Sequence, residues 1–292
     1  MPNGFGCQSM VASLKRVIVK RPEEAFRNMA SIEREWYPLG YLRRPDLRVA
    51  CEEHRALISA LKSSGAEVLE LPEDSRTGLD SLYAHDPVLI TNEGAVVFQM
   101  GKVARRGEGP AIADALKNWN IPILGFVQSG TGEAGDMIWL DETTLLVGRG
   151  FRTNARGIAE LESLLKPKGI HLIPVPLPYF NGPDDVLHLM SFMSMLDRDL
   201  AVVYRKLIPV PLYELLVERE VQLIDVPDEE YDSMACNVLA LSPRKVLAVR
   251  GNPITKSRME AAGCSVIELQ GNEICIPGSG GPTCLTRPLL RG

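Results

Sequence analysis

A cysteine near the end of the chain stands in a setting suited to chemistry. Cys284 follows the bend Gly280-Gly281-Pro282 and precedes a short apolar run. Glycines let the backbone turn tightly and approach a ligand closely. The nucleophile of a cysteine enzyme is the thiolate, which needs a base and charged groups beside it. We therefore expect Cys284 to lie at the mouth of a strand as a candidate nucleophile.

Other side chains that could take part in chemistry stand just before or at the start of β-rich runs. They are Asp86, Glu133 with Asp136, His188, and the pair Cys236-Asn237. Acids, an imidazole and a thiol could together bind and cleave a cationic group. Of the two neighbouring acids, we assign Glu133 to chemistry and Asp136 to support of the loop.

Each of these residues also has a purely structural interpretation. His188 lies in an apolar run and could be a hydrogen-bonded core histidine, and Asp86 precedes Pro87 and could simply begin a turn. Cysteines are often small buried apolar residues. We assign that packing role to three of them, Cys236, Cys264 and Cys275, and we interpret Cys7 as a thiol in a disordered end.

The positions of these residues follow from a repeat in the chain. Five times, a helix-like stretch ends at a breaker and a short β-rich run follows. These runs cover residues 65–72, 120–127, 169–176, 220–227 and 263–270. Before two of them, residues 49–64 and 154–166 carry apolar residues at helical spacing, and Gly65 and Gly169 suit helix C-termini.

Predicted β-hairpins lie between these units. They pair residues 87–91 with 95–99, 137–140 with 144–147, 188–195 with 200–204, and 237–241 with 245–250. A fifth pair forms only if residues 284–290 join residues 14–20. The sequence thus predicts an α/β ring of five ββαβ units, a five-bladed propeller with pseudo-fivefold symmetry that is closed by the two termini. We expect residues 1–292 to form a single domain.

Composition excludes several classes of protein. The chain has 292 residues and a net charge of -5, so a binder of nucleic acid, which needs clustered positive charge, is not expected. No apolar run reaches the length of a membrane helix, and the first residues lack a charged segment followed by an apolar one, so secretion is not expected. Six scattered cysteines without metal-ligand spacing favour reduced thiols, a cytoplasmic location and no metal site.

Four separated motifs resemble the guanidine-modifying branch of the pentein superfamily. They are Glu133-Ala134-Gly135-Asp136-Met137, residues 148–157 (GRGFRTNARG), Leu187-His188-Leu189-Met190-Ser191 and Gly280-Gly281-Pro282-Thr283-Cys284. Within that branch the chain is most similar to the dimethylarginine dimethylaminohydrolases. Arginine deiminases and amidinotransferases are more distant relatives. The resemblance runs from about residue 14 to the end and implies the pentein fold.

The resemblance also implies residue roles. The nucleophile falls on Cys284, the general acid and base on His188, and the carboxylate beside the histidine on Glu133. A guanidinium-binding acid falls on Asp86, and groups that hold the amino-acid end of the substrate fall on Asp80, Arg105 and Arg152. Two positions depart from relatives. His85 replaces a second acid of some dimethylargininases, and Met190 replaces an aspartate of deiminases and amidinotransferases.

These assignments imply hydrolysis of a guanidino compound through a covalent thiouronium on the cysteine. Nω-methylated arginine, converted to citrulline and methylated amine, is the first candidate substrate. Arginine deiminase, arginine dihydrolase or amidinotransferase activity is the alternative, and a non-catalytic binding ring is a weaker one. No cofactor is expected. Two basic residues, Arg105 and Arg152, should bind a substrate carboxylate because buried guanidinium groups need an anion. Residues 35–46 could form a mobile lid. Oligomeric state stays open.

Overall fold

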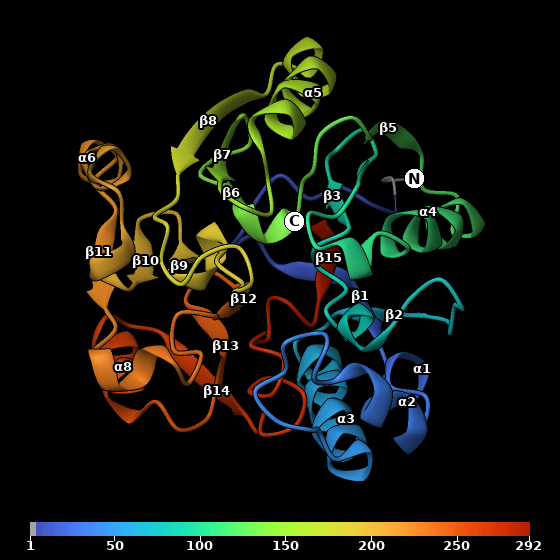
Figure 1. Cartoon of the computed structure of the whole chain (residues 1–292). Coiled ribbons are helices and arrows are strands. Elements are labelled where there is room, and N and C mark those ends of the chain that lie inside the picture. Colours follow the sequence, from blue (N-terminus) through green and yellow to red (C-terminus); the bar gives the residue numbers. More distant parts are fainter. Residues whose placement is uncertain (1–3) are drawn as a thin grey trace.

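Five three-stranded sheets are arranged in a ring around a common centre (Figure 1). The computed structural model describes residues 4–292. In each sheet one outer strand pairs antiparallel with the middle strand, and the other outer strand pairs parallel with it. A helix links the two parallel strands of each sheet. The predicted ring of five ββαβ units is therefore confirmed.

The sheets follow one another along the chain. Their strands are β15 (Arg287–Arg291), β1 (Leu14–Lys20) and β2 (Glu67–Leu71); β3 (Val88–Ile90), β4 (Ala95–Phe98) and β5 (Ile123–Val127); β6 (Met137–Trp139), β7 (Thr144–Arg149) and β8 (His171–Pro176); β9 (Met193–Asp197), β10 (Leu200–Val203) and β11 (Gln222–Asp225); and β12 (Leu239–Ser242), β13 (Lys245–Val249) and β14 (Ser265–Leu269).

One long helix accompanies each sheet, and shorter helical turns fill the connections. The linking helices are α3 (Leu47–Ser63), α4 (Glu108–Asn118), α5 (Ala155–Leu165), α6 (Val210–Glu218) and α8 (Pro253–Ala261). The short ones are α1 (Pro22–Ala25), α2 (Met29–Glu35) and α7 (Asp228–Tyr231). The 3₁₀ turns are η1 (Leu79–Leu82), η2 (Val103–Arg105), η3 (Ala134–Asp136), η4 (Lys166–Lys168), η5 (Leu189–Ser191) and η6 (Arg205–Leu207).

Local sequence signals explain where the predicted helices begin and end. The Asp46 side chain accepts a hydrogen bond from the Val49 backbone at the start of α3, and Asn154 does the same for Gly157 at the start of α5. Gly65 and Gly169, just beyond α3 and η4, have positive φ angles, which glycine adopts without strain. Both helices thus match the predicted ranges within a few residues.

The chain ends close the ring. β1 pairs antiparallel with β15, and the preceding segment continues this contact because Gly6 donates its N–H to the Leu289 carbonyl and accepts from Arg291. Cys7 is consequently buried, with its thiol directed to the Ser9 carbonyl. The prediction that Cys7 lies in a disordered end was wrong, because pairing with β15 orders this segment.

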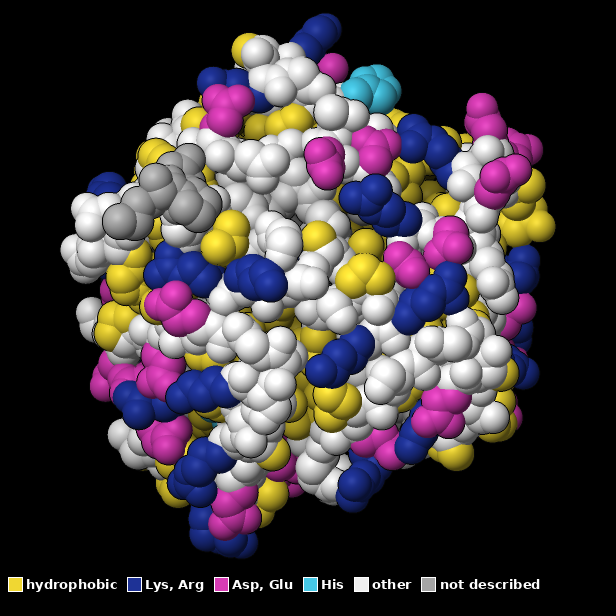
Figure 2. All heavy atoms as spheres, turned by 180° about the vertical axis from the view of Figure 1, so that it is seen from behind, with side chains coloured by type: hydrophobic (Ala, Val, Ile, Leu, Met, Phe, Trp, Pro, Cys, Tyr) yellow, Lys and Arg dark blue, Asp and Glu magenta, His cyan; other side chains and the backbone are white. Residues whose placement is uncertain are grey.

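Two further features concern the surface. Among residues 4–292, the structure contains no helix whose length and apolar character would let it cross a membrane. On the face drawn in Figure 2, basic side chains lie singly or beside acidic ones over the residues described. The surface also carries exposed ion pairs, such as Arg205 with Asp225 and Arg219 with Asp141. Such exposed pairs contribute little to stability.

Candidate active site

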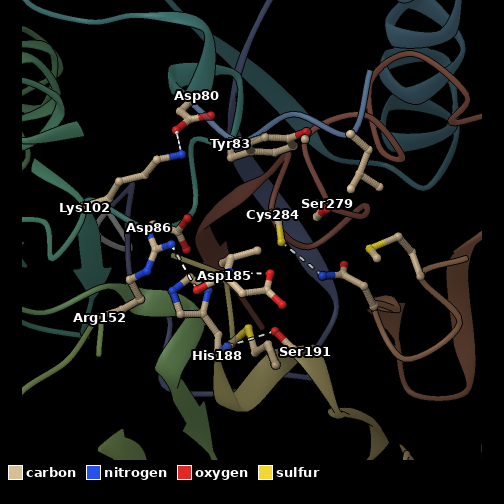
Figure 3. Close-up of a pocket in the computed structure, with 18 of the residues that line it drawn as sticks. Asp80, Tyr83, Asp86, Lys102, Arg152, Asp185, His188, Ser191, Ser279 and Cys284 are labelled. Carbon is tan, nitrogen blue, oxygen red and sulfur yellow. Dashed lines mark hydrogen bonds and ion pairs between the residues drawn. The ribbon is translucent and has the colours of Figure 1, made fainter. Parts of the chain in front are cut away.

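A cavity of about 410 Å³ lies where connections from all five sheets meet (Figure 3). Six of the seven residues predicted for the site line it, namely Asp80, Asp86, Arg105, Arg152, His188 and Cys284. Glu133 is fully buried and lies behind His188, outside the cavity wall. The structure thus brings all seven side chains to one region of the ring.

The fold positions these residues through a feature that recurs in each of the five units. Each sheet is entered by a short irregular segment that precedes its outer antiparallel strand. Asp86 precedes β3 by two residues, Glu133 precedes β6 by four, His188 precedes β9 by five, Asn237 precedes β12 by two and Cys284 precedes β15 by three. Because the five units are related by the ring, these five segments converge.

His188 differs from its predicted position in one respect. The sequence predicts a strand that begins at His188, whereas β9 begins at Met193 and residues Leu189–Ser191 form the turn η5. The Ser191 hydroxyl accepts a hydrogen bond from the His188 backbone N–H at 2.9 Å and favours the turn. An apolar run alone did not distinguish a buried turn from a strand.

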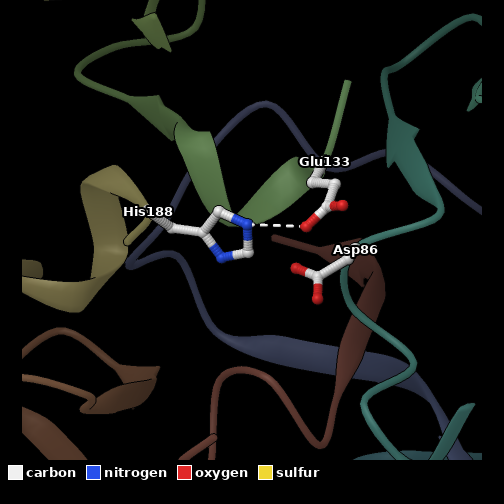
Figure 4. Close-up of side chains that lie close together, drawn as sticks. All are labelled: Asp86, Glu133 and His188. Carbon is white, nitrogen blue, oxygen red and sulfur yellow. Dashed lines mark hydrogen bonds and ion pairs between the residues drawn. The ribbon is translucent and has the colours of Figure 1, made fainter. Parts of the chain in front are cut away.

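Glu133 and His188 form the central pair of the site (Figure 4). His188 Nε2 lies 2.8 Å from Glu133 Oε2. Burial alone would lower the pKa of His188, but the carboxylates of Asp136, Glu133 and Asp86 outweigh it and raise the pKa to about 9. Burial likewise disfavours the Glu133 anion, yet its hydrogen bond with His188 leaves the pKa of Glu133 below its usual range. At neutral pH we therefore treat the pair as imidazolium and carboxylate.

The glycine between the two acids of this loop is required by packing. A Cβ atom on Gly135 would lie 2.4 Å from His188 Nδ1. On its other side, Asp136 accepts a hydrogen bond from the Leu189 N–H at 3.0 Å, which fixes the residue after His188. Burial raises the pKa of Asp136 to about 7. The loop therefore supports His188 both through Glu133 and through Asp136.

Asp86 is a buried anion on the cavity wall. Its Oδ2 accepts from Arg105 Nη1 at 2.6 Å and its Oδ1 accepts from the Gly135 N–H at 3.2 Å. Burial acts to raise the pKa of Asp86, but the charges of Arg105 and His188 lower it to about 2. Asp86 is thus ionised at neutral pH and able to accept further N–H donors from a ligand.

Arg105 is bound by the protein on every nitrogen. Besides Asp86, it donates to both carboxylate oxygens of Glu108 at 2.9 Å and to the Tyr83 carbonyl at 3.1 Å. The sequence argument held that buried Arg105 would need a carboxylate from the substrate. That premise was wrong for Arg105, because Glu108 and Asp86 supply the anions. Its geometry indicates that it positions Asp86.

Cys284 is the one described cysteine that is partly exposed, although protein atoms surround its thiol, and none of the described cysteines forms a disulfide. Asn237 Nδ2 donates to its Sγ at 3.0 Å, while Asn237 Oδ1 accepts from the Thr283 N–H at 3.0 Å. Burial, followed by the charge of Asp86, raises the pKa of Cys284 to about 12, and the Asn237 hydrogen bond partly opposes this. A pKa of about 12 corresponds to a protonated thiol at neutral pH.

Lys102, a residue that the sequence did not single out, contacts both Glu133 beside His188 and Asp80 at the other end of the cavity. Its backbone N–H donates to Glu133 Oε1 at 3.0 Å, and its ammonium donates to Asp80 Oδ2 at 2.6 Å. Arg152 lies nearby, with Nη1 3.8 Å from Glu133 Oε1 and Nη2 donating to the Asp185 carbonyl at 3.3 Å. Arg152 has a weaker set of protein partners than Arg105.

The repeat placed Asn237, together with Cys236, among the converging residues at the strand mouths, but sequence reasoning gave it no role. Lys102 was not considered at all. Nothing in the sequence around Lys102 distinguishes it from a surface lysine. Its partners Asp80 and Leu39 come from other segments and meet it only in the folded chain.

Ligand atoms of Asp86, Glu133 and His188 all lie within 4.8 Å of one another, a spacing that a metal ion could use. The charges of the site argue for a different occupant. His188 is protonated at neutral pH and has no free lone pair on Nε2, while Asp86 is paired with Arg105. Asp86 lines the cavity and can accept N–H groups from a cationic ligand, so the site suits such a cation better than coordination of a metal by the three residues together.

Comparison with known proteins agrees with the geometry. Residues 44–291 match the family described as N,N dimethylarginine dimethylhydrolase, eukaryotic. The chain belongs to this family of hydrolases. It is 28% identical, over 80% of its length and 86% of the relative, to N(G),N(G)-dimethylarginine dimethylaminohydrolase of Pseudomonas aeruginosa. It is also 28% identical to arginine deiminase of Listeria monocytogenes, over 81% of this chain and 70% of the relative.

Solved structures give the same result for the fold. A structure of the Pseudomonas aeruginosa enzyme in complex with citrulline matches 94% of this chain and 99% of that chain, with a TM-score of 0.77 and 25% sequence identity. The resemblance to the pentein superfamily that the four motifs indicated is therefore confirmed.

Proposed function

We propose that this protein hydrolyses a C–N bond of a guanidino group, with Cys284 as the nucleophile. One observation carries the proposal. A single cavity contains a free thiol, an imidazolium paired with a buried carboxylate, and a separate ionised carboxylate on the wall. A guanidinium is a planar cation with several N–H donors, and carboxylates bind it in a fixed plane.

Asp86 is the group best placed to orient the guanidinium. It lines the cavity, is ionised, and is held by Arg105 and the Gly135 N–H. Glu133 does not line the cavity, and both of its oxygens already accept hydrogen bonds from His188 and Lys102. Holding the guanidinium against the thiol by Asp86 supplies proximity, while Glu133 acts through His188.

The bound cation would also activate the nucleophile. Burial and the charge of Asp86 raise the pKa of the Cys284 thiol to about 12. A guanidinium beside the sulfur lowers the thiol pKa, so that the thiol releases its proton to solvent, and Asn237 donates a hydrogen bond to the resulting thiolate. The sulfur then bonds to the guanidino carbon. His188 gives its proton to the departing nitrogen, the C–N bond breaks, and a thiouronium remains on Cys284.

The second step reverses the roles of the imidazole. Neutral His188 takes a proton from water, and the water oxygen bonds to the thiouronium carbon. The C–S bond breaks, and Cys284 leaves as a thiolate. The hydroxyl group that water added to the carbon gives its proton to this thiolate, which restores the thiol and leaves a neutral ureido group on the product. The Glu133 carboxylate stabilises the imidazolium that forms again, because it lies 2.8 Å from Nε2.

Within this chemistry, the family supports Nω-methylated arginine as the first substrate to test, with citrulline and methylated amine as the products. Hydrolysis of unmethylated arginine to citrulline and ammonia is the second candidate, supported by the similarity to arginine deiminases. The unpaired cysteines fit a proposed cytoplasmic location, where thiols stay reduced.

The test is product analysis on a panel of guanidino compounds. Arginine, its methylated forms, agmatine and smaller guanidines are each incubated with the wild type and with Cys284→Ser, and ureido products and released amines are measured. We expect a ureido product from at least one compound with the wild type and none with Cys284→Ser. A new guanidine formed when an amine acceptor is supplied would instead indicate amidino transfer. Equal activity of Cys284→Ser would refute the proposal.

A further inference from the structure

An ammonium group of the protein already occupies one end of the cavity. Lys102 Nζ donates to Asp80 Oδ2 and to the Leu39 carbonyl, each at 2.6 Å. All three residues line the cavity, and Figure 3 shows Lys102 and Asp80 together above Cys284, Asp86 and His188. A carboxylate and a carbonyl that accept from the same nitrogen form a binding site for an ammonium ion. In this chain the site is filled by Lys102.

The protein holds Lys102 in this position from both sides. Its backbone N–H is fixed by Glu133 Oε1 at 3.0 Å, at the reacting end of the site. Its side chain then spans to Asp80, whose side chain is only 7% exposed. The lysine side chain is 24% exposed, and Lys102 is one of the residues that line the cavity. Lys102 is therefore held in the cavity wall by contacts of both its backbone and its side chain.

A ligand that carries an α-ammonium would compete with this arrangement. To reach Asp80 Oδ2 and the Leu39 carbonyl it must displace Lys102, which would lose both hydrogen bonds and remain close to a second positive charge. Like charges brought together in a partly closed site repel each other. A guanidino compound without the α-ammonium meets no such competition.

A ligand carboxylate, unlike a ligand ammonium, would be attracted to this end of the cavity. A lysine ammonium has three N–H donors, of which two are used here, so one is available. Arg152 also lines the cavity, and its nearest carboxylate oxygen is 3.8 Å away. Arg105, by contrast, has all its nitrogens bound to protein oxygens. Lys102 and Arg152 are thus the cations that can receive a carboxylate.

We propose that Lys102 makes this enzyme selective for guanidino carboxylic acids that lack an α-ammonium, because it fills the ammonium site and offers its remaining N–H to the carboxylate. The inference rests on the proposed function, since it assumes that Cys284 attacks the guanidino carbon of the same ligand. Methylated arginine is then a slow substrate of the same chemistry, and desaminoarginine (arginine without its α-amino group) and its methylated form are better ones.

The experiment compares these matched ligands, which differ only in the α-ammonium. Initial rates of ureido product formation are measured for the wild type, Lys102→Met and Lys102→Arg. Lys117→Met, on the exposed face of α4, is the control. The wild type should favour the desamino compounds by about tenfold or more in kcat/KM, as repulsion between like charges predicts. Lys102→Met should reduce this ratio to about threefold or less, by lowering KM for arginine and raising KM for desaminoarginine.

The two variants separate charge from structure. Lys102→Met keeps the backbone N–H that binds Glu133, so kcat should change little, and Lys102→Arg keeps a cation and should retain the preference. Asp184 and Asp232 also line the cavity and could bind a ligand ammonium without displacing Lys102. In that case the wild type would prefer the α-amino compounds, or Lys102→Met would leave the ratio unchanged, and either result overturns the inference.

A binding measurement separates this inference from the proposed function. Calorimetric affinities of Cys284→Ser, with and without Lys102→Met, are measured for arginine and desaminoarginine. A desamino preference that Lys102→Met removes supports the inference even if no compound is turned over. Turnover through Cys284 with a ratio insensitive to Lys102 supports the proposed function alone. The wild-type ratio remains a test if Lys102→Met does not fold.

Discussion

At the scale of single residues, the charges of the site suit the binding of a cationic ligand. Asp86 and Glu133 are anions, His188 is a cation, and the Cys284 thiol is neutral. The sequence could identify these four residues because each has a side chain that could take part in chemistry and each stands at the equivalent position of the repeat, at a strand mouth. It could not identify Lys102, whose partners Asp80 and Leu39 meet it only through tertiary structure.

The first prediction concerns the titration of Cys284. A thiol is neutral when protonated, and burial and Asp86 disfavour the anion, so the thiolate should form only as pH rises toward a pKa of about 12. Thiolate absorbance in the ultraviolet, taken as the difference between the wild type and Cys284→Ser, should stay near zero from about pH 6 to 9 and rise measurably only at higher pH. A titration midpoint near neutral pH in the unliganded protein would contradict the proposed activation by substrate.

The second prediction concerns Asn237. In Asn237→Asp the retained Oδ1 can still accept from Thr283, but the donor to the Cys284 sulfur becomes a carboxylate oxygen. An adjacent anion should raise the thiol pKa, and each unit of that rise should lower kcat/KM about tenfold. Steady-state kinetics test this, with an unfolding curve to show that stability is kept. An unchanged kcat/KM would remove Asn237 from the nucleophile's environment.

At the scale of elements, prediction succeeded where a local signal sets the boundary. The helices α3 and α5 begin at Asp46 and Asn154, which cap them, and positive-φ glycines follow them. It failed at His188, where an apolar run forms the turn η5 before β9 begins. The deciding hydrogen bond, from the His188 N–H to the Ser191 hydroxyl, joins residues that are close in the sequence, but the pattern of apolar residues does not reveal it.

The third prediction concerns the contact between α5 and the loop that carries Glu133. A Cβ on Gly157 would lie 2.0 Å from the Thr131 carbonyl oxygen. Alanine normally favours a helix over glycine by about 1 kcal/mol, but here it must push the loop away. Gly157→Ala should therefore lower stability by about 1–3 kcal/mol, as overpacking does, and reduce kcat.

Denaturant unfolding and steady-state kinetics measure both effects of Gly157→Ala. Gly150→Ala is the matched control, because its Cβ would meet only the Leu177 side chain at 3.1 Å, which can move. If Gly157→Ala proved as stable and active as Gly150→Ala, the loop would not depend on this close approach.

At the scale of the whole molecule, the ring was predictable because hairpins and helices repeat along the chain and one hairpin can form only from the two ends. What the repeat does not reveal is how β15 joins its neighbours. Arg287 donates to the Val88 carbonyl in the second sheet, and Arg291 donates to the Ala240 carbonyl in the fifth. Both are buried, and burial lowers the pKa of Arg287 to about 10. Arginines in a predicted strand would normally be expected to face solvent. The contacts of these two arginines with neighbouring sheets could therefore be found only in the structure.

The fourth prediction follows from closure by the termini. Joining Gly292 to the N-terminus with a short flexible linker and opening the chain between the exposed residues Lys168 and Gly169 keeps every strand pair, so this permuted protein should fold and retain kcat within about threefold. Deleting residues 287–292 removes β15, leaves β1 without its antiparallel partner and should abolish cooperative unfolding. Circular dichroism during thermal unfolding and activity measure both. A stable, active deletion variant would show that closure is dispensable.

The central claim is that Cys284 forms a covalent bond to the carbon of a guanidino group. The most direct test is peptide mass spectrometry of the wild type quenched in acid during turnover of the best compound from the panel. The account predicts an added amidino-type mass on the peptide that contains Cys284, on none of the other cysteines, and absent from Cys284→Ser. Turnover with no adduct, together with activity of Cys284→Ser, would contradict it.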